Sequence, residues 1–120
     1  MGIVQTYTET IHNLPGGPWH FENDKVFNVP AGTLTINEWS LGTQFIPGTS
    51  VRAILFWDQN SDGKLVQIDS LYTSKATRFY KFPEGTSFVS TGNSRVIVHR
   101  AVLGKDTPRE VFVRWAGDLS

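Results

Sequence analysis

Short segments of alternating apolar and polar residues, separated by glycine- and proline-rich turns, constrain this chain more than any other feature. No stretch of about ten residues keeps the i, i+3, i+4, i+7 apolar spacing of a helix without interruption by Gly, Pro or β-branched clusters. Segments rich in Val, Ile, Thr and aromatic residues predict strands instead. We place them near Ile3–Ile11, Lys25–Val29, Thr33–Trp39, Val51–Trp57, Leu65–Leu71, Arg78–Phe82, Arg95–Leu103 and Glu110–Trp115.

The turns between these segments recur at the spacing of an all-β sandwich or barrel, which share the same alternation. They include Pro30-Ala31-Gly32, Pro47-Gly48-Thr49, Asp62-Gly63 and Pro83-Glu84-Gly85. The 120 residues are about the length of one domain, and no long linker divides them. We therefore expect residues 1–120 to form a single two-sheet β-sandwich of about eight antiparallel strands.

Alternation assigns the buried faces. On three of the predicted strands, alternate side chains are expected to point into the core. They are Leu34 and Ile36 on one strand, Val96, Val98 and Val102 on another, and Val111, Val113 and Trp115 on the last. If Asp62-Gly63 forms a two-residue turn, Trp57 lies opposite Ile68 and Gln59 opposite Val66. The core face of this hairpin is then predicted to carry Val51, Ala53, Leu55, Trp57, Val66 and Ile68.

The other face of the same hairpin carries Ile54 and Phe56, which are too apolar for a water-facing strand. Either a loop of the chain covers them or another subunit does. We name Ile54, Phe56 and Leu65 as the candidate subunit contact.

Composition excludes several classes of function. The 11 basic and 11 acidic residues cancel, so nothing attracts the chain to nucleic acid or an anionic membrane. The longest wholly apolar run, Ala53–Trp57, is far shorter than a membrane span. There is no Cys, no Gly-x-Ser-x-Gly elbow and no Gly-rich phosphate loop, and the three histidines lack metal-ligand spacing on one strand. We expect no catalytic site and no cofactor.

The segment Asp58-Gln59-Asn60-Ser61-Asp62-Gly63, followed by Asp69, matches the ligand spacing of a calcium-binding EF-hand loop. An EF-hand needs flanking helices, whereas these flanks read as strands, which would carry Asp69 away along the returning strand. A partial calcium site at Asp58, Asn60 and Asp62 is one alternative, and a solvated turn is the other.

Four tryptophans in a small domain raise the alternative of sugar binding, because an exposed aromatic ring can stack on a sugar. Trp57 and Trp115 are expected in the core by alternation. Trp19, in a loop, and Trp39, at a strand end, are the candidate ligand platform. Packing of the loop by its own aromatic residues is the competing interpretation.

Residues Ser50–Gly63, with the sequence SVRAILFWDQNSDG, resemble a segment of jelly-roll coat proteins of small icosahedral viruses, where a Val-Arg strand runs into an aromatic-Asp-polar turn. Arg78-Phe79-Tyr80-Lys81-Phe82 is similar to the Arg-Phe strand that follows in those proteins. This resemblance, over about residues 50–82, implies a jelly-roll sandwich in a virion. The nearly uncharged N-terminus departs from the basic arm that many coat proteins use to package nucleic acid.

From the residues and the resemblance together we expect a non-enzymatic virion structural protein: a capsid, decoration, spike or tail-associated protein that assembles through surface contacts. Its expected partners are copies of itself or other virion proteins, and its expected location is the virion or extracellular space, with assembly in the host cytoplasm. The alternative is a carbohydrate-binding module, with or without a calcium ion.

Overall fold

The computed structural model describes residues 2–12, 20–21, 23–43, 50–73, 78–81, 86–103 and 108–120, with the backbone alone at 7, 9, 11, 12, 20, 21, 43, 73, 78–81, 108 and 109. The described residues form strands and turns. The strands are β1 (Gly2–His12), β2 (His20–Phe21), β3 (Lys25–Val29), β4 (Gly32–Thr43), β5 (Ser50–Asp58), β6 (Val66–Thr73), β7 (Arg78–Lys81), β8 (Ser87–Ser90), β9 (Ser94–Leu103) and β10 (Pro108–Leu119). Within these ranges, no helix has the length and apolar character needed to cross a membrane.

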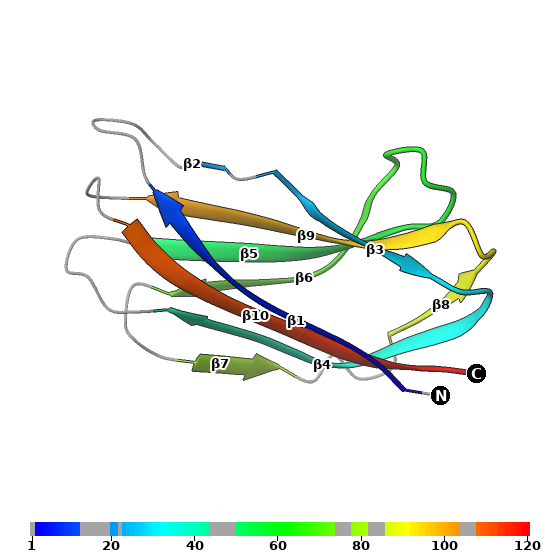
Figure 1. Ribbon diagram of the computed structural model, residues 1–120. Coiled ribbons are helices and arrows are strands. Elements are labelled where there is room, and N and C mark those ends of the chain that lie inside the picture. Colours follow the sequence, from blue (N-terminus) through cyan, green and yellow to red (C-terminus); the bar gives the residue numbers. More distant parts are fainter. Residues whose placement is uncertain are drawn as a thin grey trace.

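The strands form two antiparallel sheets that pack face to face (Figure 1). One sheet has the order β1-β10-β4-β7, with β8 also paired to β4. The other has the order β2-β9-β5-β6, with β3 also paired to β9. Because β7 and β8 pair with different stretches of β4, and β2 and β3 with different stretches of β9, each pair occupies one position at a sheet edge. Each sheet therefore has four strand positions.

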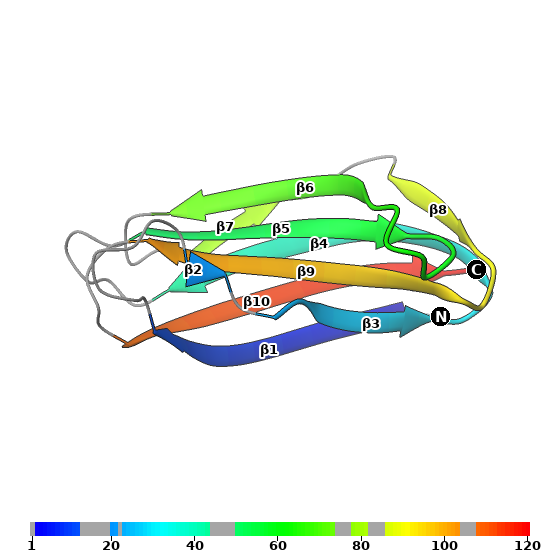
Figure 2. The ribbon, with the colours of Figure 1, turned by 90° about the horizontal axis from the view of Figure 1, so that it is seen from above.

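The pairing partners are nested in the sequence. β5 pairs with β6, β4 with β7 and β8, β3 with β9, and β1 with β10, all antiparallel. This is the pattern of one long hairpin, rolled up so that β10 also pairs with β4 and β9 with β5. Seen from above, the sheet that contains β9, β5 and β6 overlies the sheet that contains β1, β10 and β4 (Figure 2). Eight antiparallel strand positions rolled into two sheets define the jelly roll, so the predicted fold class is confirmed.

The core lies between the sheets and is built as alternation predicted. Leu34, Ile36, Val96, Val98 and Val102 are fully buried there, as are Val111, Val113 and Trp115. Two partly buried rings pack against buried tryptophans of the core: Phe27 meets Trp115 edge to face at 5.9 Å, and Phe88 stacks on Trp57 at 5.0 Å. Aromatic pairs in these geometries add to the stabilisation from area burial alone.

The hairpin of β5 and β6 differs from the prediction. Trp57 lies opposite Val66 and Leu55 opposite Asp69, so a wide loop, not a two-residue turn, joins the strands. Val66 is 54% exposed and its assignment to the core was wrong, whereas Ile68 packs against the core beside a bulge. The loop is wide because the Asp58 carboxylate accepts hydrogen bonds from two backbone amides within it and because Gly63 adopts a left-handed φ of 80°.

Candidate functional site

The outer face of the sheet β2-β9-β5-β6 carries the candidate contact residues. Alternation along β5 buries Val51, Ala53, Leu55 and Trp57 and turns Ile54 and Phe56 to this face, where both side chains are partly buried. Cross-strand pairing sets Phe56 beside Ile97, which lies beside Val26 on the neighbouring strand β3. Val26 is 45% exposed, whereas Ile97 is buried. The three form an apolar stripe across the outer face.

The monomer already covers part of this stripe. The Phe56 ring meets the His99 imidazole edge to face at 6.5 Å, and Ile54 is the register partner of His99. His99 Nδ1 in turn lies 2.8 Å from Asp24 Oδ1. Leu65, the third candidate contact residue, is 40% exposed in the loop that precedes β6. The role of Ile54, Phe56 and Leu65 as a subunit contact remains a prediction.

Trp39 is not an exposed platform, and that prediction was wrong. Its side chain has no exposed surface, and it lies opposite Trp115 in the register of β4 and β10. The cause is a bulge: Ile36 pairs with Gly117 and Glu38 with Ala116, so Asn37 is an extra residue that reverses the alternation after Ile36. Trp19, the other platform residue, lies outside the described residues.

The bulge depends on close contact between strands. A Cβ atom at Gly117 would lie 2.8 Å from the carbonyl oxygen of Thr35 and 3.0 Å from Leu34 Cδ1. A side chain at residue 117 would therefore push β4 and β10 apart at the point where the alternation of β4 is reset.

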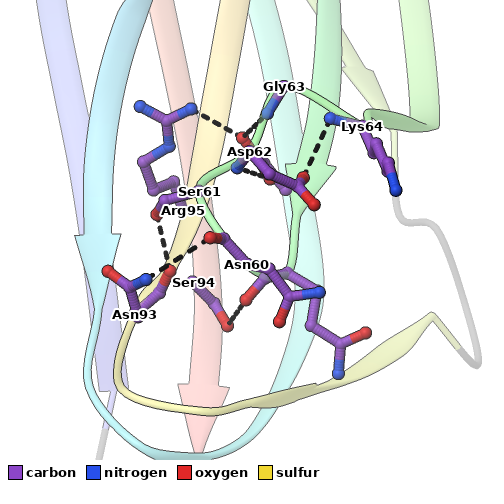
Figure 3. A network of polar contacts seen from close by, with 10 residues as sticks. Asn60, Ser61, Asp62, Gly63, Lys64, Asn93, Ser94 and Arg95 are labelled. Atoms are coloured by element: carbon purple, nitrogen blue, oxygen red, sulfur yellow. Dashed lines mark hydrogen bonds and ion pairs between the residues drawn. The ribbon is translucent and has the colours of Figure 1, made fainter.

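Asn60 and Asp62 lie at the tip of the β5–β6 hairpin (Figure 3). Asp58 is the last residue of β5 and is hydrogen-bonded to the Asp62 backbone amide. The Asp58 side chain is fully buried. Its Oδ1 accepts a hydrogen bond from the Asp62 backbone amide at 3.1 Å, and its Oδ2 accepts one from the Gly63 amide at 3.1 Å and one from Arg95 Nη2 at 2.6 Å. Both carboxylate oxygens are thus engaged by donors of this chain.

The same tip is bound to the turn between β8 and β9. Ser94 Oγ donates to the Gln59 carbonyl at 2.6 Å, Asn93 Nδ2 donates to the Asn60 carbonyl at 3.3 Å, and Ser61 Oγ donates to the Asn93 carbonyl at 2.5 Å. Figure 3 shows these contacts joining the two loops. This network gives the polar residues of the tip a structural role, because it fixes one end of the sandwich.

A calcium ion would compete with Arg95 for Asp58, because the guanidinium already places positive charge at the carboxylate. Asp62 Oδ1 accepts the Lys64 amide at 3.0 Å. Among the described residues, no three His, Cys, Asp or Glu side chains converge in a way that could hold a metal ion. Calcium binding at Asp58, Asn60 and Asp62 remains an untested prediction, and the geometry favours the network of protein hydrogen bonds.

The environment of Asp58 changes its acidity. Burial by itself raises the pKa of the carboxyl group, but the hydrogen bonds from Arg95, Gly63 and Asp62, with the charge of Arg95, outweigh burial and lower the pKa from 3.8 to about 2. The carboxylate therefore stays charged in the folded protein at pH values where it would be protonated in the unfolded chain.

We expect this shift to make stability fall in acid. Since the folded pKa is the lower one, the charged Asp58 contributes its full stabilisation above about pH 4, and the contribution is lost as the pH falls towards about 2. Urea midpoints measured across this window should fall more steeply for the wild type than for Asp58→Asn. Parallel curves for the two proteins would show that other carboxyl groups control acid stability.

A second surface feature was not predicted from the sequence. The outer face of the other sheet contains a hollow of about 210 Å³, lined by Thr6 and Thr8 of β1, Ser40 and Gly42 of β4, and Phe112, Val113 and Arg114 of β10. The alternating Thr residues of β1 and the Ser-x-Gly of β4 are the only signals of it in the sequence. They could not locate it, because the hollow depends on which strands are neighbours.

The strand order and pairing place the described part of the chain in the class of jelly rolls. No protein-family model matches the sequence, and no curated protein is similar to it. Solved structures do match in fold. The structure of infectious bursal disease virus Gx strain aligns with a TM-score of 0.52 and 11% identity over 98% of this chain and 33% of the viral chain.

Two further viral structures superimpose on this chain less closely. The VP2 subviral particle of infectious bursal disease virus gives a TM-score of 0.47 at 9% identity, and the Gt strain gives 0.41 at 12% identity. The chain spans about a third of the length of these viral chains. The likeness to the Gx strain confirms, at the level of fold, the resemblance to viral jelly-roll proteins that residues 50–82 indicated.

Proposed function

We propose that the chain is a structural protein of a virion, without enzymatic activity, that assembles through contacts between copies of itself. The observation that carries the proposal is the nested jelly-roll topology, which aligns over 98% of the chain with a virus structure. The proposal includes four possible positions in the particle: a capsid, decoration, spike or tail-associated protein. It also includes a location in the virion or extracellular space, with assembly in the host cytoplasm.

The apolar stripe of Val26, Ile97 and Phe56, with Ile54 beside it, is the surface that we assign to contact between copies. Full burial of one such side chain contributes about 1.5–3 kcal/mol. Because Ile54 and Phe56 are already partly buried, each contributes only part of that value. Association also costs translational and rotational freedom, so one contact is weak and a closed symmetric assembly is needed to repeat it.

The charge distribution favours this partner over nucleic acid. The net charge is zero, and two of the basic side chains form ion pairs with carboxylates: Arg95 with Asp58 and Arg114 with Glu38. A surface that binds phosphate backbones needs an excess of unmatched Lys and Arg. Contact through apolar and neutral polar groups suits a second copy of the same chain.

Replacing Phe56 with Glu should abolish assembly and leave the monomer folded, because the new carboxylate would be desolvated in the contact. Light scattering coupled to size exclusion, across a wide range of concentration, would give the mass of the wild type and the variant. Circular dichroism would verify the fold. We expect a closed oligomer for the wild type and a monomer for the variant.

Two further variants make the test specific. Val26→Glu lies on the same stripe at a more exposed position and should also yield monomers, which guards against a folding defect in Phe56→Glu. Val89→Glu, at a residue that is 63% exposed on β8 of the other sheet, should assemble normally. An unchanged oligomer in both stripe variants, or a wild type that stays monomeric at high concentration, would refute the proposed contact.

The alternative function, a carbohydrate-binding module, loses Trp39 as a platform because that ring is in the core. The hollow over β1, β10 and β4 is a separate observation that favours sugar binding, at a different place from the one expected.

A further inference from the structure

We propose that the hollow on the outer face of β1, β10 and β4 binds a single neutral sugar residue. Two rows of cross-strand neighbours build it. The first row runs from Thr6 to Arg114 to Ser40, and the second from Thr8 to Phe112 to Gly42. Gly42 has no side chain and Ser40 a short one, so the surface sinks over β4 beside the larger side chains of β10.

The polar groups around the hollow have unused hydrogen-bonding capacity. Arg114 Nε donates to Glu38 Oε1 at 2.9 Å, but its two terminal nitrogens bond to none of the described residues. The hydroxyls of Thr6, Thr8 and Ser40 likewise have no side-chain hydrogen bond within the described part of the chain. Ser40 is only 8% exposed, so a ligand in the hollow would supply a partner to a hydroxyl that has little contact with water.

These groups select a polyhydroxylated ligand. Each Thr or Ser hydroxyl can both donate and accept a hydrogen bond, as a sugar hydroxyl does, and the Arg114 nitrogens add donors. Phe112 supplies an apolar wall for the C–H face of a sugar ring. A purely apolar ligand would desolvate the three hydroxyls without giving them partners, which costs free energy.

The charges beside the hollow and its volume limit which ligands can bind. Glu38 neutralises Arg114, so an anionic ligand would gain little from the guanidinium and would be repelled by the carboxylate. The volume of about 210 Å³ is below the roughly 300–1,000 Å³ of pockets for drug-sized ligands, which limits the occupant to one ring. We expect weak binding by one domain and much tighter binding where many copies engage a multivalent glycan.

Saturation-transfer NMR with neutral methyl glycosides of glucose, galactose, mannose and N-acetylglucosamine, and with a methyl sialoside as the charged comparison, tests the proposal on the full chain. At least one neutral glycoside should bind, and it should bind about tenfold more weakly to Arg114→Gln and to Thr8→Val, since each loses a hydrogen bond to the sugar. Thermal unfolding of each variant would establish that it is folded.

Thr10→Val provides the matched control. Thr10 lies on the same strand and the same face, one alternation beyond Thr8 and outside the lining of the hollow, so this variant should bind like the wild type. Binding of none of the neutral glycosides would overturn the proposal, as would an equal loss in Thr10→Val and Thr8→Val. Binding of the sialoside alone would overturn the assignment of a neutral sugar. The measurement uses monomeric ligands and does not depend on assembly, so it stands or falls separately from the virion proposal.

Discussion

Replacing Trp39 with Ala should lower the free energy of unfolding by about 3–5 kcal/mol, because the ring is fully buried and its removal leaves a large cavity between the sheets. The loss is a large fraction of the roughly 5–15 kcal/mol by which small domains are stable. Urea unfolding monitored by fluorescence of the remaining tryptophans and by circular dichroism would measure it. A loss below about 1 kcal/mol, typical of exposed positions, would contradict the buried placement of Trp39.

Trp39→Phe is the informative companion variant. Trp39 Nε1 is buried and has no hydrogen-bond partner among the described residues, so the wild type carries the cost of an unsatisfied donor. Phe retains most of the ring and removes that donor. We therefore expect this variant to lose much less stability than Trp39→Ala. An equal loss in both variants would show that the indole nitrogen has a partner.

Replacing Asp58 with Ala should cost about 3 kcal/mol, since it deprives two loop amides and the Arg95 guanidinium of their acceptor at once. This cost lies at the lower end for a buried ion pair because the Arg95 side chain is 27% exposed and can regain water. The free energy of unfolding near neutral pH, from urea titration, is the relevant measurement.

Asp62→Ala is the matched control for Asp58→Ala. Asp62 lies on the same loop, is exposed, and accepts one hydrogen bond from the Lys64 amide, so its loss should cost less than about 1 kcal/mol. A double-mutant cycle of Asp58→Ala with Arg95→Met should show a coupling of more than about 1 kcal/mol. Equal effects of Asp58→Ala and Asp62→Ala would mean that the buried carboxylate is no more important than a surface one.

Much of the fold could be predicted because strand identity and strand face depend on local patterns. Val96, Val98 and Val102 were assigned correctly since a regular strand turns alternate side chains to opposite faces. The predicted ends of strands were less accurate: β4 continues to Thr43 and β10 to Leu119, and the short strands β2 and β8 were not predicted. Such short strands carry too few residues to show alternation and form because β9 and β4 offer free edges to pair with.

The candidate sites were predicted less well, for a related reason. The outward direction of Ile54 and Phe56 followed from alternation alone, but the cover that His99 gives Phe56 required the pairing of β5 with β9. The polar sequence Asp58–Gly63 predicted either a partial calcium site or a solvated turn. Its structural role depends on Arg95, which is distant in the sequence and lies beside Asp58 in the fold.

The sequence by itself determined that the chain is all-β, which residues form the main strands, and which side chains of a regular strand share a face, since these depend on neighbours along the chain. Only the tertiary structure decided what depends on neighbours in space. The extra residue Asn37 in the pairing of β4 with β10 turned Trp39 into the core, and the meeting of β1, β10 and β4 formed the hollow. Register and strand order arise from the packing of both sheets together, and a single strand carries no record of them.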